Sequence, residues 1–454
     1  MFIARKKELS VLKKEFQSDH KTAVLVYGKR RIGKSTLISE ASSSFHGIVI
    51  NYLCSQTTVQ GNLSLLTESI CAVLNLPSIH FSHFTDLFTF LGTQKQQFLI
   101  ILDEYQYLKE GGKKGEVDSM MQGIIDRLPA NIKIVLCGSY ITVMKELLNE
   151  ENPLFGRFTS VIHLEELDYY DASLFHSDLS VSDQIAHYAV FGGSPYVISN
   201  TCHTSVKEGI IRLLLPETGI LRIYVENVIL KEIQKLYDVR ILQVIGNGKA
   251  RYKQIEDTLG MKANGLLTKQ LKQLVNMETI RKVSPINKRD DKKKQFYEIN
   301  DNLIRFYFTY IFGKQSILSS LGEEAYCRLY IQPSVSEFIS RRFESIVIQY
   351  FQRQIRAGKI TDVYDIGSYW YDDPKMHQNG EFDCVLKKKT GYDMIECKYY
   401  KKPMTLSECK DEEQQVLSIP DMNIDSIGFV CSSGFDFISD QYHLITGKDL
   451  YSKS

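Results

Sequence analysis

The chain has 454 residues, of which 43% are hydrophobic and 24% are charged. A chain of this length forms more than one hydrophobic core, so we expect two to four domains. Its 55 Lys and Arg residues against 54 Asp and Glu residues leave a net charge of +1. This balance excludes a global electrostatic attraction to nucleic acid, although local basic patches still matter.

The sequence shows no pattern typical of a targeting segment, a disulfide framework or a zinc site. The start, MFIARKKEL, has no apolar segment of a signal peptide, and the apolar runs are too short to span a bilayer. The nine cysteines include neither a CxxC pair nor a Cys/His cluster at zinc spacing. We therefore expect a cytoplasmic protein with no membrane partner.

The first 37 residues predict a nucleotide-binding element. Residues 1–16 predict a short strand and an amphipathic helix. Residues 23–37 then read AVLVYGKRRIGKSTL, in which an apolar strand is followed by the spacing G-x-x-x-x-G-K-[ST] and a helix-forming segment. Backbone N–H groups of such a loop hold phosphates at a helix N-terminus.

The predicted roles within the loop follow from this chemistry. Lys34 is expected to reach the β- and γ-phosphates of ATP, and the Ser35 hydroxyl to ligate Mg²⁺. The predicted nucleotide-binding residues are Gly28, Lys29, Arg30, Arg31, Ile32, Gly33, Lys34, Ser35 and Thr36.

A second motif follows a strand predicted over residues 98–102. A second buried strand is predicted at residues 47–53, with helices through residue 91, before the apolar run FLIIL ends in Asp103 and Glu104. Such a run is typical of a parallel strand buried on both faces, whose carboxyl end faces the ligand crevice. Asp103 is thus predicted to hold Mg²⁺, and Glu104 to orient the water that attacks ATP.

Two further residues each have two interpretations. Ser139 follows a buried strand predicted at residues 132–136, and either senses the γ-phosphate or belongs to a simple Gly-Ser turn. Arg157 precedes a strand predicted at residues 160–164. It is either an arginine finger, in its own or a neighbouring subunit, or a solvated or salt-bridged surface residue.

Residues 167–223 have a helical pattern that is broken at 191–195 by FGGSP, and they have the size of a lid over the nucleotide. In order, the segments YGKRRIGKSTLI, FLIILDEYQYL, LCGSY, PLFGRF and FGGSPYVI resemble the prokaryotic ATPases of the AAA+/STAND neighbourhood, often called the archaeal-type ATPase family. The resemblance covers the first half of the chain. It implies ATP binding and slow or regulated hydrolysis.

The segment from 226 to 312 predicts a winged helix-turn-helix. Helices are expected at 239–245, 252–259 and 264–275, followed by a β-hairpin formed by 278–285 and 295–301. Residues 281–294 include seven basic and two acidic residues, which suits contacts to DNA phosphates, although such hairpin tips are also commonly just solvated. On the third helix, Lys269 and Lys272 are the plausible residues to contact DNA.

The last part of the chain predicts a metal site. A helix at 338–354 carries Glu344, and strands are expected at 381–385 and 393–398. Side-chain alternation places Glu396 and Lys398 on one face of the sheet, beside Asp383 on the neighbouring strand. Two carboxylates and a lysine suit Mg²⁺ or Mn²⁺ beside a general base or water-orienting ammonium. A helix at 406–417 and a strand at 426–431 complete an α/β/α order.

This D-x12-E-x-K pattern resembles the PD-(D/E)XK nuclease superfamily and the C-terminal domain of unknown function that often accompanies these ATPases. The resemblance implies that Glu344 is the helix acid, that Asp383 and Glu396 are metal ligands, and that Lys398 is the catalytic lysine. The usual Pro-Asp dipeptide is replaced by Glu381-Phe382-Asp383.

Together these patterns predict an α/β protein: a P-loop NTPase parallel sheet (1–165) with a helical lid (166–225), then a winged helix (226–315), then an α/β restriction-endonuclease-like domain (316–454). The predicted function is a Mg²⁺-dependent ATPase coupled to a nucleic-acid-binding or nuclease-like C-terminal half. The alternative is an ATP-dependent switch or scaffold that binds a protein or DNA partner, or self-assembles, without cleavage.

Overall fold

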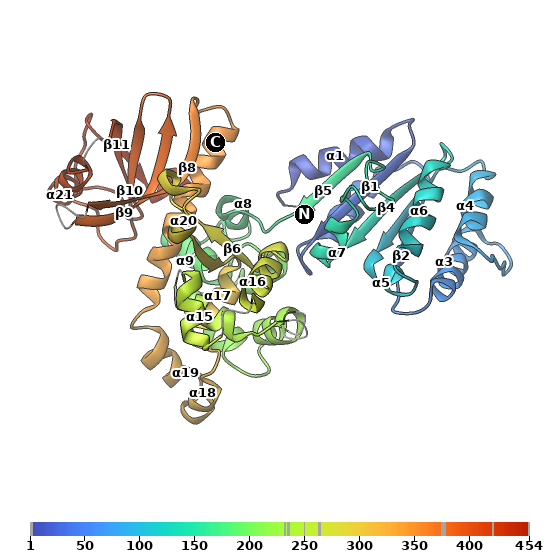
Figure 1. Ribbon diagram of the computed structural model, residues 1–454, viewed down its shortest axis with the longest axis horizontal. Coiled ribbons are helices and arrows are strands. Elements are labelled where there is room, and N and C mark those ends of the chain that lie inside the picture. Colours follow the sequence, from blue (N-terminus) through green and yellow to red (C-terminus); the bar gives the residue numbers. More distant parts are fainter. Residues whose placement is uncertain are drawn as a thin grey trace. The chain divides into compact units, whose positions relative to one another are not determined.

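The computed structural model describes residues 3–230, 233, 237–248, 250–261, 265–373, 378–419 and 422–452 (Figure 1). It divides into two compact units, Met1–Glu166 and Leu167–Ser454. Within the described ranges, no helix is both long and apolar enough to cross a bilayer. Met1, Phe2 and Asn264, which belong to predicted elements, lie outside the described residues.

The first unit is built on a five-stranded parallel sheet with the order β2-β3-β4-β1-β5. The central strands β1, β3 and β4 are mostly apolar and are buried along almost their whole length, because both of their faces are covered. The predicted parallel sheet is therefore confirmed. The strands are β1 (Thr22–Gly28), β2 (Ile48–Leu53), β3 (Phe98–Asp103), β4 (Ile132–Gly138) and β5 (Ser160–Leu164).

Two expectations for this unit are wrong in detail. The strand β2 was expected to be buried, but it lies at the sheet edge, where the Leu53 side chain is 61% exposed. Residues 3–5 form no strand, since Ala4 and Arg5 both have a positive φ, 65° and 58°.

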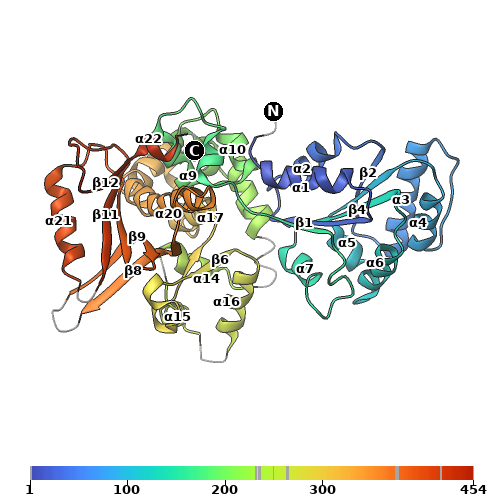
Figure 2. The same cartoon turned by 90° about the horizontal axis from the view of Figure 1, so that it is seen from above.

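Helices cover both faces of this sheet (Figure 2). Val24 and Val26 of β1 pack against α1 and α2, whereas Leu25 and Tyr27 belong to the cluster on the opposite face. The helices α1 (Lys6–Gln17) and α2 (Lys34–Ser42) lie on the first face. The second face carries α3 (Val59–Leu74), α4 (Phe84–Gly92), α5 (Tyr105–Glu110), α6 (Glu116–Asp126) and α7 (Ile141–Glu146).

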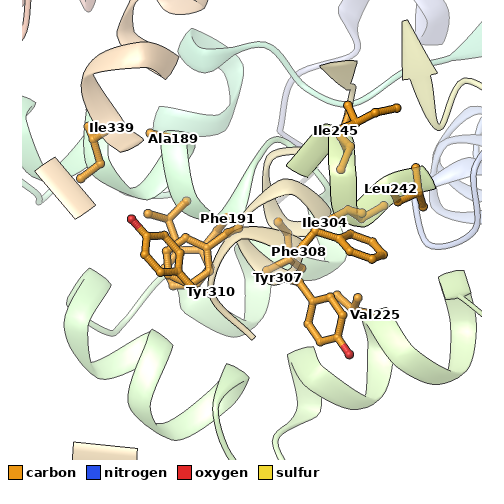
Figure 3. Close-up of a cluster of buried hydrophobic side chains, with 14 of the residues drawn as sticks. Ala189, Phe191, Val225, Leu242, Ile245, Ile304, Tyr307, Phe308, Tyr310 and Ile339 are labelled. Carbon is orange, nitrogen blue, oxygen red and sulfur yellow. The ribbon is translucent and has the colours of Figure 1, made fainter. Parts of the chain in front are cut away.

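The second unit begins with a helical segment that shares a core with later parts of the chain. Phe191 and Val225 belong to the same buried cluster as Phe308 (Figure 3). The predicted break at 191–195 separates α9 from α10, and the role of the segment as a lid stays a prediction. Its helices are α8 (Tyr169–Ser173), α9 (Val181–Phe191), α10 (Pro195–Thr201), α11 (Val206–Gly209) and α12 (Ile220–Ile223), with π-helical turns at Ile210–Leu214 and Tyr224–Leu230.

Three helices and a hairpin follow, in the predicted order. They are α14 (Arg240–Gly246), α15 (Tyr252–Leu259), α16 (Leu266–Asn276) and the antiparallel pair β6 (Ile280–Val283) and β7 (Phe296–Ile299). The winged-helix assignment itself stays a prediction.

The loop between β6 and β7 differs from the expected solvated or phosphate-binding tip. Its Ile286 packs with Phe382 in a small buried cluster, and the Arg289 guanidinium pairs with Asp365 at 2.7 Å. Arg281 pairs with Glu298 on the opposite strand. Two of the basic side chains expected to contact DNA are therefore already neutralised within the protein.

The C-terminal part forms a mixed sheet with the order β12-β11-β10-β9-β8, in which β8 to β10 are antiparallel and β10 to β12 parallel. Phe343 of α20 packs with Ile395 and Cys397, whereas α21 packs on the other face, where Val416 contacts the cluster of Met394. The predicted α/β fold class is thus confirmed. The strands are β8 (Val363–Asp373), β9 (Gln378–Lys388), β10 (Tyr392–Lys398), β11 (Ile424–Cys431) and β12 (His443–Thr446). The helices are α17 (Asn302–Tyr310), α18 (Gln315–Leu321), α19 (Glu323–Tyr326), α20 (Val335–Arg356), α21 (Leu406–Leu417) and α22 (Gly447–Leu450), with a π-helical turn at Cys327–Ile331.

A buried histidine pair makes the stability of the second unit depend on pH. The rings of His176 and His187 lie 4.6 Å apart, and both side chains are buried. Burial, together with the neighbouring His176, lowers the pKa of His187 to about 4, against weaker opposing effects of a backbone hydrogen bond at Thr204 and of the Asp183 charge. Burial also lowers the pKa of His176.

We expect the free energy of unfolding of this unit to fall as the pH drops from 6.5 toward 4. In that window the unfolded chain binds a proton at His187 that the folded protein excludes. The resulting loss in the free energy of unfolding is about 3 kcal/mol at pH 4. Urea unfolding followed by Trp370 fluorescence measures this, since Trp370 is the single tryptophan and lies in β8. The variant His187→Leu should flatten the curve between pH 6.5 and 4, and an unchanged pH dependence would contradict the assignment.

Candidate functional site

The phosphate loop joins β1 to α2 and has the backbone geometry that its glycines allow. Arg31 and Gly33 have positive φ angles of 61° and 94°, so the chain curls around the first turn of α2, which begins at Lys34. A Cβ atom on Gly28 would lie 2.3 Å from the backbone oxygen of Leu164 on β5. Only glycine therefore fits at the first position of the motif.

Lys34 lies inside this loop and is only 6% exposed. The ammonium donates hydrogen bonds to the backbone oxygens of Gly28 and Lys29, both at 2.9 Å. Burial lowers the pKa of Lys34, and the carboxylates of Glu104 and Asp103 act in the opposite direction. The loop thus holds a positive charge at the N-terminus of α2, where the helix dipole also favours an anion.

Asp103 and Ser35 lie together, as predicted, at the carboxyl end of β3. The Ser35 hydroxyl donates to Asp103 Oδ2 at 2.9 Å, and the backbone N–H of Glu104 donates to Oδ1 at 2.9 Å. A hydroxyl beside an oriented carboxylate matches the oxygen ligands that Mg²⁺ prefers. The two side chains would hold Mg²⁺, which neutralises phosphate charge when it is bound.

Glu104 has a left-handed backbone conformation, with φ 52° and ψ 45°, that is rare for a residue with a side chain. Its Oε2 accepts a hydrogen bond from the Ser139 hydroxyl at 2.6 Å and another from the Gln106 amide. The Gln106 amide also lies 3.3 Å from the Ser139 hydroxyl. Ser139 therefore contacts the candidate base directly.

Gln106 was missed by the sequence reasoning. It is fully buried on α5, two residues after Glu104, and its position in DEYQYL was the available signal. A Cβ on Gly138 would lie 2.6 Å from the Gln106 side-chain oxygen, so Gly138 makes room for this amide.

The remaining residues of the loop differ in their surroundings. Arg30 donates to the Tyr107 hydroxyl at 2.6 Å and lies over the Tyr140 ring at 5.3 Å. Lys29 pairs with Glu166 at 3.7 Å. Of the others, Ile32 is buried in the core, whereas Arg31 and Thr36 are exposed.

Arg157 does not reach the phosphate loop of its own chain. Its guanidinium makes two hydrogen bonds to Asp126, at 3.0 and 3.2 Å. It precedes β5, and the Thr159 N–H donates to Ala23 at the start of β1, whereas the phosphate loop follows the end of β1. Arg157 therefore lies near the amino ends of the strands, away from the phosphate loop of its own chain, and its salt bridge to Asp126 favours the surface interpretation. A role as an arginine finger for a neighbouring subunit stays a prediction.

In the second unit, β9 and β10 bring three of the predicted residues together. The Lys398 ammonium donates to Glu396 at 2.8 Å, which confirms that both lie on one face of β10. The antiparallel register pairs Ile395 with Cys384, which places Asp383 opposite Glu396. Glu412 of α21, which the sequence reasoning missed, also pairs with Lys398, at 2.6 Å.

The carboxylates of this cluster are half-buried and lie close together. Burial, together with the charge of Glu344 on α20, raises the pKa of Asp383 to about 7. Burial and the Asp383 charge raise the pKa of Glu396 to about 8. Burial opposes the charge on Lys398, but Glu396 and Glu412 raise its pKa above the ordinary value.

The metal prediction for Glu344, Asp383 and Glu396 stays a prediction. In the described part of the chain, no three His, Cys, Asp or Glu side chains are arranged to hold a metal ion. Carboxylate oxygens suit Mg²⁺ or Mn²⁺ chemically, but one oxygen of Glu396 is already bonded to Lys398.

Two family models match the chain. Residues 2–200 match an ATPase domain predominantly from Archaea, and residues 307–414 match archaeal and bacterial proteins of unknown function. Residues 2–200, which cover the first unit and the start of the second, therefore form an ATPase domain. The chain is also 27% identical, over 393 residues, to the uncharacterized protein MJECL04 of Methanocaldococcus jannaschii, covering 85% of this chain and 84% of that protein.

The chain is also similar to solved structures at low sequence identity. The Walker-type ATPase PABY2304 of Pyrococcus abyssi is 19% identical with a TM-score of 0.47, covering 68% of this chain and 96% of that one. The ORC2 protein of Aeropyrum pernix in its ADPNP-ADP complexes is 12% identical with a TM-score of 0.46, covering 67% and 92%. The assignment of the ATPase domain rests instead on its family match and on the geometry of the phosphate loop.

Proposed function

We propose that the ATPase domain is coupled to a nucleic-acid-processing reaction in the second unit. The observation that carries this proposal is the half-buried cluster of Asp383, Glu396 and Lys398, in which two carboxylates on adjacent strands lie beside an ammonium. With Mg²⁺ or Mn²⁺ held by the carboxylates, Lys398 would orient the water that cleaves a phosphodiester bond.

In the ATPase domain, the residues of the phosphate loop and of the end of β3 each have one role in ATP hydrolysis. When ATP is bound, Lys34 would exchange its contacts with the loop carbonyls for the β- and γ-phosphates, and Ser35 and Asp103 would hold Mg²⁺. Glu104 then leaves Ser139 and Gln106 to orient the attacking water. This exchange of partners makes hydrolysis conditional on a local rearrangement.

A DNA partner fits part of the preceding region. Lys269 and Lys272 are exposed along α16. On β6, the Lys282 ammonium lies 5.8 Å from the centre of the Tyr297 ring. These side chains would contact phosphates rather than read bases, so binding would have little sequence preference.

A second function is favoured by the contacts of Lys398. Its ammonium is already held by two carboxylates, Glu396 and Glu412, which suits a structural cluster as well as a catalytic one. In that case the protein is an ATP-dependent switch for a protein or DNA partner, or for its own assembly, and the nuclease-like part does not cleave.

Replacing Asp383 separates the two functions. We expect Asp383→Asn to reduce metal-dependent cleavage of DNA or RNA by roughly a hundredfold or more, because a neutral amide is a poor metal ligand. The fold should tolerate this change, since burial already favours the neutral carboxyl. Cleavage is measured with labelled single- and double-stranded substrates in Mg²⁺ or Mn²⁺, with and without ATP.

Asp411→Asn is the matched control, because Asp411 is exposed on α21, next in sequence to Glu412. Lys34→Ala tests coupling, since it should remove any dependence of cleavage on ATP. Equal cleavage by Asp383→Asn and the parent would exclude the assigned site. Absence of cleavage by the parent under all conditions would favour the switch.

A further inference from the structure

A cavity lined by arginines lies in the second unit, outside the cluster of Asp383 and Lys398. Its volume is about 220 Å³, and it is bounded by the turn after α14, by Arg305, Thr309 and Tyr310 of α17 and by the first two turns of α20. A Cβ on Gly246 would lie 2.6 Å from the Phe308 Cβ, so the end of α14 can approach α17 this closely only with glycine. The cavity is thus built by helix packing rather than by a loop.

Arg342 is the unusual residue of this cavity. It is 8% exposed, and its Nε and Nη1 atoms are buried without a hydrogen-bond partner. Its guanidinium lies 6.0 Å from the Phe338 ring, which contributes a weak cation–π contact only. A buried charge that lacks a counter-ion costs several kcal/mol, so the site is energetically incomplete without an anion.

The charged neighbours leave an excess of positive charge. Arg305 lines the buried side and pairs with Glu298 at 3.1 Å, and Arg341 pairs with Glu337 at 2.5 Å, where both side chains are exposed. Among the arginines that line the cavity, Arg342 is the one for which the described structure shows no ion pair. The first turn of α20, a helix of 22 residues, adds the positive end of its dipole beside Ser334.

We propose that this cavity binds a phosphate group, with the Arg342 guanidinium as its principal donor. Planar guanidinium groups match the geometry of phosphate oxygens, and a phosphate can accept from several arginines at once. The volume is below the range of cavities that enclose drug-sized ligands, so a phosphate with a small attached group fits best. The phosphate would belong either to a small molecule or to the end of a nucleic acid strand.

This inference is independent of the proposed cleavage reaction, because none of the cluster residues lines the cavity. The test uses the full chain carrying Lys34→Ala, so that the phosphate loop contributes little to binding. Inorganic phosphate is titrated calorimetrically at constant ionic strength, with chloride as the competing anion. We expect saturable binding, weakened at least about tenfold by Arg342→Met.

Arg356→Met is the matched control, because Arg356 is exposed at the far end of α20. We expect it to bind phosphate as the parent does. Removing an unpaired buried charge relieves its desolvation cost, so Arg342→Met should unfold at the same or a higher urea concentration, as measured by Trp370 fluorescence. Arg342→Lys, which keeps the charge but loses the planar fork, provides a second variant with weakened binding.

The two sources of phosphate are separated with oligonucleotides that have a 5′-phosphate or a 5′-hydroxyl. Tighter binding of the phosphorylated strand, lost in Arg342→Met, assigns the site to nucleic acid ends, and equal binding of both strands assigns it to a small phosphorylated molecule. The proposal is overturned if the parent binds no phosphate, or if Arg342→Met binds it with the affinity of the parent.

Discussion

Glu104→Gln should lower the rate of ATP hydrolysis by roughly 10²- to 10⁴-fold while leaving ATP affinity nearly unchanged. The amide keeps the shape of the side chain but cannot accept a proton from the attacking water. Binding should persist because Lys34, Ser35 and Asp103 hold their positions through contacts that do not involve the Glu104 carboxylate. Phosphate release measures the rate, and a fluorescent ATP analogue measures the affinity.

Glu110→Gln provides the control for this substitution, because Glu110 is an exposed carboxylate at the end of α5. Its hydrolysis rate should match that of the parent. If Glu104→Gln hydrolysed ATP as fast as the parent, another residue would have to orient the water, and the contact of Glu104 with Ser139 would be purely structural.

The phosphate loop could be predicted from sequence because its chemistry lies in consecutive residues. Strand, glycine turn and helix N-terminus follow one another between Thr22 and Ser42, so no distant contact is needed to place Lys34. The alternation along β10 was equally local, and it placed Glu396 and Lys398 correctly.

Features that depend on contacts between distant segments could not be predicted in this way. Glu412 reaches Lys398 from a separate helix, and Arg289 finds Asp365 at a separation of 76 residues. The two interpretations of Arg157 stayed open in the sequence for the same reason. Only the strand order and register show whether its loop lies at the amino or the carboxyl ends of the strands.

The glycine break at 191–195 was recognised as an interruption of the helix, but its tertiary role was not visible in the sequence. The Leu167 N–H donates to the Gly193 oxygen at 2.9 Å. The two backbones approach so closely that a Cβ on Gly193 would lie 1.9 Å from the Leu167 oxygen. Since Leu167 is the first residue of the second unit, this contact fixes where the chain enters that unit.

Gly193→Ala should therefore destabilise the second unit by about 3 kcal/mol or more, because the clash involves backbone atoms that cannot rotate away. Urea unfolding followed by Trp370 fluorescence measures the loss in the unit that contains the substitution.

Gly123→Ala is the opposite case, since it lies within α6 and a Cβ there has no atom within 4 Å. It should stabilise its helix by about 0.5–1 kcal/mol, measured by calorimetry. An unchanged unfolding midpoint for Gly193→Ala would mean that the two backbones can separate at little cost. ATP binding by the first unit should survive Gly193→Ala, because the phosphate loop and the Glu104 network belong to the first unit, whereas the substitution lies in the second.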